Sequence, residues 1–90
     1  MPLTFEWDQS KSVANERKHG VTFEEAKTVF NDPYAITIGD PGRSNDEFRY
    51  IDIGFSSSGR FLVVWYTERY ESIRIIGCRK ATRFERKEYE

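Results

Sequence analysis

The chain has 90 residues, and its 14 Lys and Arg against 15 Asp and Glu give a formal net charge of −1. This length predicts a single domain, residues 1–90, and argues against a large enclosed active-site cavity. Near-neutrality argues against a protein that coats polyanions by bulk charge, so an anion site would be local. The single cysteine cannot form an internal disulfide, and no spacing suggests a metal or another cofactor. Without a signal peptide or a membrane-length apolar run, we expect a cytoplasmic protein with no membrane contact.

The N-terminal third predicts a short extended segment followed by two helices. Residues 5–7 read as a first strand or an apolar strap, and a helix over 9–18 begins at the N-cap Asp8 and ends at Gly20. Thr22 and Glu25 then have the spacing of a capping box, which predicts a second helix ending before Pro33.

The remaining sequence predicts a sheet and a last helix. Strands are expected at residues 34–38, 48–55, 60–68 and 72–80, with a long loop at 39–46. Their short connections require antiparallel neighbours, and a second capping box, Thr82 with Glu85, starts a C-terminal helix. The fold class is therefore α+β, with two N-terminal helices, a mostly antiparallel sheet of about four strands and a short C-terminal helix.

Strand alternation assigns the arginines to faces of this sheet. Arg49 is predicted on the face opposite Tyr50, and Arg74 on the face opposite Ile73. Arg79, at the end of the same strand as Arg74, is predicted on the Ile73 face.

Basic residues gather after residue 73, although the whole chain is nearly neutral. Between Arg74 and Lys87 there is one acid, Glu85, and there are six basic residues: Arg74, Arg79, Lys80, Arg83, Arg86 and Lys87. Together with Arg49 they predict a phosphate site, because a guanidinium group can donate two N–H groups to phosphate oxygens at once. The alternative is that the strand arginines are solvated or form ion pairs, with Glu47, Asp52 or Glu68 as partners.

Other side chains could complete a nucleic-acid site. Tyr50 and Tyr66 could stack on unpaired bases, and the last helix could extend the basic track or merely expose its polar face. His19 could transfer a proton or only stabilise the C-terminus of its helix. Cys78 has no histidine near it in sequence and is expected in the core.

Two blocks of sequence carry a resemblance to a known family. The first is FEWD at 5–8, Lys11, Asn15, KHGV at 18–21, FEEA at 23–26 and Asp32-Pro33; the second is Arg74-Ile75-Ile76, Arg79, Ala81-Thr82 and Glu85-Arg86. In order and spacing, these blocks resemble the BrnT family of toxins over nearly the whole chain, with residues 39–47 the least diagnostic.

This resemblance implies a RelE-like ribonuclease fold and the toxin of a type II toxin–antitoxin pair. Such a toxin would be a metal-independent endoribonuclease that cleaves RNA and halts translation. Its partner would be a BrnA-like antitoxin with a ribbon-helix-helix domain, forming a hetero-oligomer that contacts DNA only through the antitoxin. In RelE-like nucleases the neighbouring ribose 2′-hydroxyl attacks the phosphate, while protein side chains transfer protons and stabilise charge.

The resemblance also suggests roles for individual residues. Lys18 or His19 is the expected proton-transfer group, and Glu68 is an alternative base. Arg49 and Arg74 would stabilise the pentacovalent phosphate. The RNA backbone would be held by Arg79 and Arg83, with Tyr50, Arg86 and Lys87 as further RNA contacts.

Two rival functions stay open from sequence alone. The domain could be a non-catalytic module that binds nucleic acid or an antitoxin. It could also be a structural interaction protein with an apolar strip that awaits a partner helix.

Overall fold

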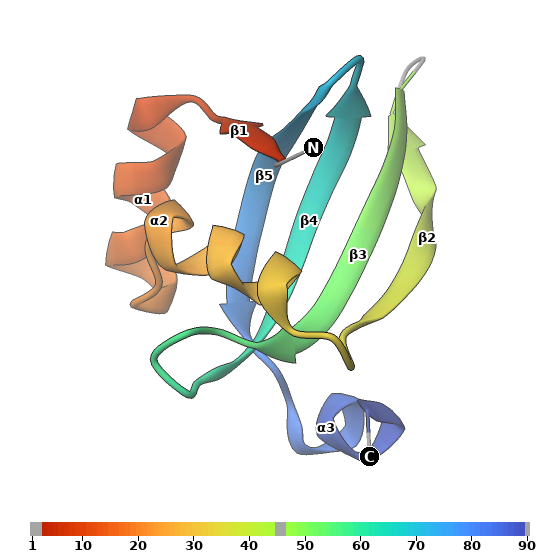
Figure 1. Cartoon of the computed structure of the whole chain (residues 1–90). Coiled ribbons are helices and arrows are strands. Elements are labelled where there is room, and N and C mark those ends of the chain that lie inside the picture. Colours follow the sequence, from red (N-terminus) through yellow and green to blue (C-terminus); the bar gives the residue numbers. More distant parts are fainter. Residues whose placement is uncertain (1–2, 45–46, 90) are drawn as a thin grey trace.

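A twisted five-stranded sheet forms the centre of the molecule, with strand order β1-β5-β4-β3-β2 (Figure 1). The computed structural model describes residues 3–44 and 47–89. The strands are β1 (Thr4–Glu6), β2 (Ile36–Ser44), β3 (Glu47–Phe55), β4 (Phe61–Arg69) and β5 (Ser72–Lys80). Strands β2 to β5 are antiparallel neighbours, and β1 joins the β5 edge in parallel.

Two predictions about the strands were wrong. The sheet has five strands rather than about four, because β1 pairs with the beginning of β5. The loop expected at 39–46 is strand up to Ser44, with a register irregularity after Asp40; residues 45 and 46 lie outside the described part of the chain. An edge strand tolerates Pro41 because only one side of it must supply ladder hydrogen bonds, so turn-forming residues misled the prediction.

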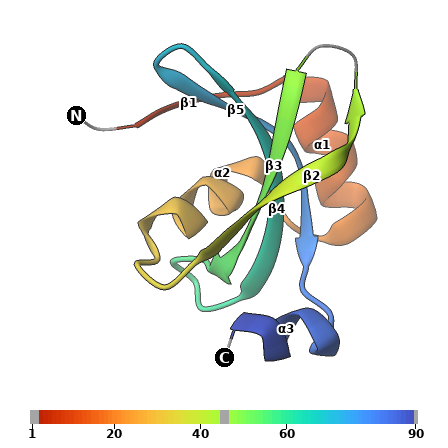
Figure 2. The same ribbon diagram turned by 90° about the vertical axis from the view of Figure 1, so that its right-hand side faces the viewer.

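The helices flank this sheet on different sides. They are α1 (Gln9–His19), α2 (Phe23–Ala26) with a 3₁₀ turn η1 (Lys27–Asn31), and α3 (Arg83–Tyr89). In Figure 1, α2 and η1 cover the front of the sheet, α1 stands beside β5, and α3 lies at the lower end. Figure 2 places α1 and α2 on opposite sides of the sheet. None of the helices in the described ranges is long and apolar enough to span a membrane.

Local signals fix the helix ends. Asp8 accepts hydrogen bonds from the backbone N–H groups of Ser10 and Lys11, and Gly20 ends α1 with a φ of 73°, as predicted. The second helix is shorter than predicted, because it continues only as the 3₁₀ turn. There the Thr28 hydroxyl donates to the carbonyl of Glu25 at 2.6 Å, a local bond that competes with α-helical pairing.

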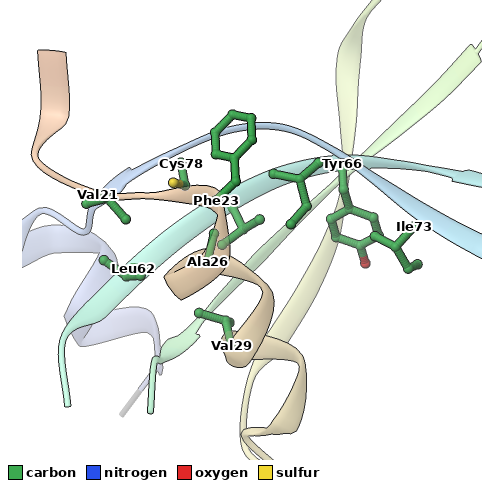
Figure 3. Packing of buried hydrophobic residues seen from close by; sticks show 10 residues of the cluster. Val21, Phe23, Ala26, Val29, Leu62, Tyr66, Ile73 and Cys78 are labelled. Carbon is green, nitrogen blue, oxygen red and sulfur yellow. The ribbon is translucent and has the colours of Figure 1, made fainter. Parts of the chain in front are cut away.

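The main core lies between the sheet and α2 with η1 (Figure 3). It contains Val21, Phe23, Ala26, Val29, Leu62, Val64, Tyr66, Ile73, Ile75 and Cys78. The core position predicted for Cys78 is confirmed, and burial raises the pKa of its thiol to about 12, so the thiol stays protonated. A smaller cluster on the other face, around Ile53, Phe61 and Val63, receives Tyr89 of α3.

A charged cluster joins α2 to the turn between β3 and β4. The Glu25 carboxylate accepts hydrogen bonds from the Arg60 guanidinium and from the hydroxyl groups of Ser56 and Ser58. These bonds, above all that from Arg60, lower the pKa of Glu25 to about 2 although its partial burial opposes the shift. Arg60 also donates to the Gly20 carbonyl at 3.0 Å, so the cluster fixes the α1–α2 connection as well.

This cluster predicts an acid-sensitive contribution to stability. Because the folded pKa of Glu25 lies below its ordinary value of 4.5, the contribution is full above that pH and is lost as pH falls toward about 2. Glu25→Gln should lower the free energy of unfolding by about 2 kcal/mol near neutral pH and by little near pH ~2. Urea unfolding at pH values from neutral to about 2 measures this loss of free energy of unfolding. The matched control is Glu24→Gln, which changes an exposed residue of the same helix. An equal loss at both pH values would contradict the assignment.

Candidate active site

A β-bulge at Ile76 interrupts the regular alternation of β5. Trp65 pairs with Gly77, but the next residue of β4, Tyr66, pairs with Ile75. Ile76 is therefore an extra residue with no partner across the ladder. After the bulge, every side chain of β5 lies on the face opposite to the one that simple alternation assigns.

The bulge corrects the predicted position of Arg79. Arg79 was predicted on the face of Ile73, and this prediction is wrong. The extra residue shifts the alternation and brings Arg79 to the face of Arg74. The guanidinium of Arg79 lies over the Trp65 ring of that face, with 5.1 Å between its carbon and the ring centroid. The same shift turns Cys78 into the core beside Ile73.

Asn15 of α1 holds the bulge in place. Its side-chain oxygen accepts a hydrogen bond from the backbone N–H of Cys78 at 3.2 Å, and its amide nitrogen donates to the Val21 carbonyl at 2.9 Å. An ideal Cβ on Gly77 would lie 3.9 Å from the Asn15 oxygen, so α1 packs closely over this part of β5. Asn15 thus ties the helix, the α1–α2 connection and the bulge together.

One row of residues crosses all five strands on the face away from α2. In register across the sheet it contains Asp40, Arg49, Thr67, Arg74 and Glu6. We call these five residues the arginine row. Two arginines flank a central threonine, and an acid stands beyond each arginine, so positive charge is concentrated at the middle of the row.

Each arginine of the row forms an ion pair with the neighbouring acid. The Arg49–Asp40 distance is 2.9 Å and the Arg74–Glu6 distance is 3.2 Å. The sequence suggested Asp52 as one possible partner, but Asp52 lies buried on the other face, where Thr37 and Tyr66 donate to it. The side chains of Arg49 and Arg74 remain 31% and 33% exposed, so both can meet a ligand from solution.

Arg79 is bound more firmly than the arginines of the row. Its two terminal nitrogens donate to the two carboxylate oxygens of Glu85 at 2.9 and 2.8 Å. Glu85 also accepts from the Thr82 N–H, and the Thr82 hydroxyl accepts from the Glu85 N–H, which confirms the predicted capping box. The bond from Arg79 lowers the pKa of Glu85 to about 2. Arg79 therefore fastens α3 to the end of β5.

Lys18 and His19 lie at the end of α1. With Lys11, Asn15 and Ile76 they line a hollow of about 260 Å³ beside the bulge of β5. Lys18 is exposed and His19 half-buried. Among the described residues, no three His, Cys, Asp or Glu side chains are grouped so that they could hold a metal ion.

Two other predicted site residues do not lie on the face of the arginine row. Glu68 follows Thr67 on β4, so its side chain is on the opposite face, where it is paired with Ile73 and exposed at the strand end. Tyr50 also lies on that face and stacks on Tyr66, with 5.5 Å between ring centroids. The structure thus gives Tyr50 a packing contact within the protein.

The basic residues of α3 occupy the end of the sheet. Arg83 and Lys87 are exposed, while the Arg86 guanidinium lies over the rings of Phe55 and Phe61 at 5.9 and 5.6 Å. Figure 2 shows that α3 lies below the sheet, so these residues border the face of the arginine row at one end.

Sequence reasoning missed four residues of this site. Thr67 and Trp65 alternate on β4 opposite the predicted position of Arg49, and this signal was available in the sequence. The acids Asp40 and Glu6 gave no such signal, because their places in the row depend on strand pairing across the whole sheet.

A family model described as "Ribonuclease toxin, BrnT, of type II toxin-antitoxin system" matches residues 7–85. The chain belongs to the BrnT family. No curated protein matched in a search with the full sequence. BrnT proteins are described as ribonuclease toxins, so the phosphate-compatible arginines lie on a member of a family that acts on RNA.

A solved structure supports the same fold. The crystal structure of the Brucella abortus ribonuclease toxin BrnT matches with a TM-score of 0.68 over 91% of this chain and 100% of that chain, at 19% sequence identity. The resemblance to BrnT toxins seen in the sequence is thereby confirmed, and the α+β arrangement of this chain is that of a solved BrnT toxin.

Proposed function

We propose that this protein is a metal-independent endoribonuclease toxin that halts translation and is neutralised by a BrnA-like ribbon-helix-helix antitoxin. The observation that carries the proposal is the arginine row, which places Arg49 and Arg74 on either side of Thr67 on an open sheet face. Family membership supplies the RNA substrate and the antitoxin class of partner. The arginine row supplies the chemistry, because guanidinium groups complement the oxygens of a phosphodiester.

The arginine row suits a reaction in which negative charge grows on phosphorus. The ribose 2′-hydroxyl attacks the adjacent phosphorus, the bond to the 5′-oxygen of the next nucleotide breaks, and a cyclic phosphate forms. Charge on the non-bridging oxygens rises in the pentacovalent species, and Arg49 and Arg74 stabilise it from two sides. Arg79, near the end of β5, and Arg83, the first residue of α3, contact the RNA backbone on the way to this centre.

Proton transfer is assigned to the end of α1. Lys18 and His19 line the hollow beside the bulge of β5, the strand that carries Arg74. One of them removes the proton from the 2′-hydroxyl or donates one to the departing 5′-oxygen. Glu68 is the weaker candidate, because its side chain is on the opposite face of β4 from the arginine row.

The antitoxin is expected to cover the arginine row. An acidic or apolar segment laid across this face would occupy the positions that RNA phosphates need, and it would neutralise the same guanidinium groups. Binding of RNA and of antitoxin would then be mutually exclusive.

Purified protein should cleave a ribosome-free synthetic RNA in the presence of a chelator. It should also leave products with cyclic phosphate or 3′-phosphate ends, as attack by the 2′-hydroxyl requires. Cleavage that stops when chelator is added would contradict metal independence. Binding of RNA without cleavage, either alone or with translating ribosomes, would instead show the non-catalytic module.

A further inference from the structure

The centre of the arginine row holds two buried polar groups that make no hydrogen bond within the described residues. These are the Thr67 hydroxyl and the Nε of Arg49. Thr67 is 2% exposed, so its hydroxyl is removed from solvent. A buried donor without an acceptor destabilises a folded protein by about 1–3 kcal/mol, and such groups in native structures call for an explanation.

Packing alone does not explain a threonine at this position. Valine would fill the space with a methyl group where threonine has its hydroxyl, and it would remove one of the two unsatisfied buried polar groups. Thr67 also differs from the other buried polar side chains of the sheet. Asp52, for example, accepts hydrogen bonds from Thr37 and Tyr66 at 2.7 and 2.8 Å.

The two unsatisfied groups lie next to each other and are both donors. Thr67 and Arg49 are directly paired across β3 and β4 and share the face of the arginine row. The Nε of arginine can only donate, and a hydroxyl can donate as well as accept. An oxygen with negative charge between them would satisfy both, while the terminal nitrogen of Arg49 keeps its bond to Asp40.

Access to this position depends on the two arginines of the row. The Thr67 hydroxyl has no exposed surface, because it lies between Arg49 and Arg74. Both side chains are long and about one-third exposed, and Arg74 is held by one bond of 3.2 Å to Glu6. A phosphate can draw the Arg74 guanidinium toward itself and reach the hydroxyl as that side chain turns, while Arg49 stays bonded to Asp40.

We propose that Thr67 Oγ and Arg49 Nε bind one non-bridging oxygen of the RNA phosphodiester, which makes Thr67 a phosphate-binding residue between the two arginines. This inference rests on the proposed function and adds the position of the phosphate. Thr67 selects a phosphodiester by geometry, because the hydroxyl and the Nε–H reach a single oxygen while Arg74 takes another.

The test compares variants at this one hydroxyl. The probe is a short single-stranded RNA with every ribose 2′-O-methylated, which cannot be cleaved through the 2′-hydroxyl and so reports binding alone. Thr67→Val should weaken binding about 10-fold, or about 1.4 kcal/mol, without lowering the melting temperature. Thr67→Ser keeps the hydroxyl and should bind within about 3-fold of the unchanged protein.

Other outcomes separate this inference from the proposed function. If Thr67→Val binds like the unchanged protein while Arg74→Ala binds weakly, the phosphate site at Thr67 is wrong and the proposed function stands. If the unchanged protein does not bind the probe, or Arg74→Ala binds equally well, both are wrong.

A measurement on the unchanged protein covers the case in which Thr67→Val fails to fold. Saturation with the same probe should shift the NMR signal of the Arg49 Nε–H, which gains an acceptor. A signal that does not move at saturation would overturn the inference.

Discussion

Replacing Arg74 with alanine is expected to reduce RNA cleavage by about 100-fold or more. That is the usual effect of removing one charge-stabilising donor from a transition state. The fold should survive, because the Arg74–Glu6 pair is partly exposed at 33% and 41%, and such pairs contribute about 1 kcal/mol or less. Initial cleavage rates on a synthetic RNA, with melting temperatures measured alongside, test this expectation.

The matched control for Arg74 is Arg17→Ala. Arg17 is an exposed arginine of α1 outside the arginine row, so its loss removes the same charge elsewhere and should change the rate by less than about 3-fold. Equal rates for Arg74→Ala and the unchanged protein would remove the row from the reaction. If both variants lost the same share of the cleavage rate, the arginine row would contribute only through the overall charge of the protein.

Replacing Asn15 with alanine is expected to lower the free energy of unfolding by about 3 kcal/mol. The change leaves the Cys78 N–H and the Val21 carbonyl without their partner, and each unsatisfied buried group costs about 1–3 kcal/mol. Hydrogen exchange at the Cys78 amide should accelerate, since the bulge loses the bond that holds it. RNA cleavage should also fall, because the bulge sets the direction of Arg79.

Lys11→Ala provides the comparison for Asn15. Lys11 lies on the same side of α1 and lines the same hollow, but it is exposed, and its replacement should stay within about 0.5 kcal/mol. If Asn15→Ala matches Lys11→Ala in stability and the Cys78 amide exchanges at its original rate, Asn15 does not hold the bulge.

Features that depend on neighbours in sequence were predictable. Each helix cap joins residues that are at most four positions apart in sequence. The structure contains the predicted caps at Asp8 and Gly20 and the capping box of Thr82 with Glu85. The second helix shows the limit of this reasoning. Its capping box was correct at Thr22, yet Glu25 bonds to Arg60 rather than closing the box, and the helix passes into 3₁₀ geometry.

Features that depend on distant residues were not predictable. The bulge in β5 is held by Asn15, which is 63 residues from Cys78 in sequence, and Gly77 is only a weak local sign of the extra residue at Ile76. Strict alternation therefore placed Arg79 on the wrong face.

The candidate site also has a part that was predictable from sequence and a part that depends on how distant strands pair. Sequence reasoning selected Arg49 and Arg74, and the register of the sheet places both in the arginine row. The alternation of β4 already assigns Thr67 and Trp65 to one face, but the pairing of β3, β4 and β5 is what places the threonine between the two arginines. The parallel pairing of β1 with β5, which brings Glu6 to Arg74, had no signal in the short segment at residues 5–7.

The most direct test of this account is a crystal structure of the protein with the 2′-O-methylated RNA. The account predicts a backbone phosphate at the centre of the arginine row, with one oxygen bonded to the Thr67 hydroxyl and guanidinium groups from Arg49 and Arg74 on either side. A phosphate bound elsewhere with the arginine row unoccupied, for example in the hollow beside Lys18 and His19, would contradict it.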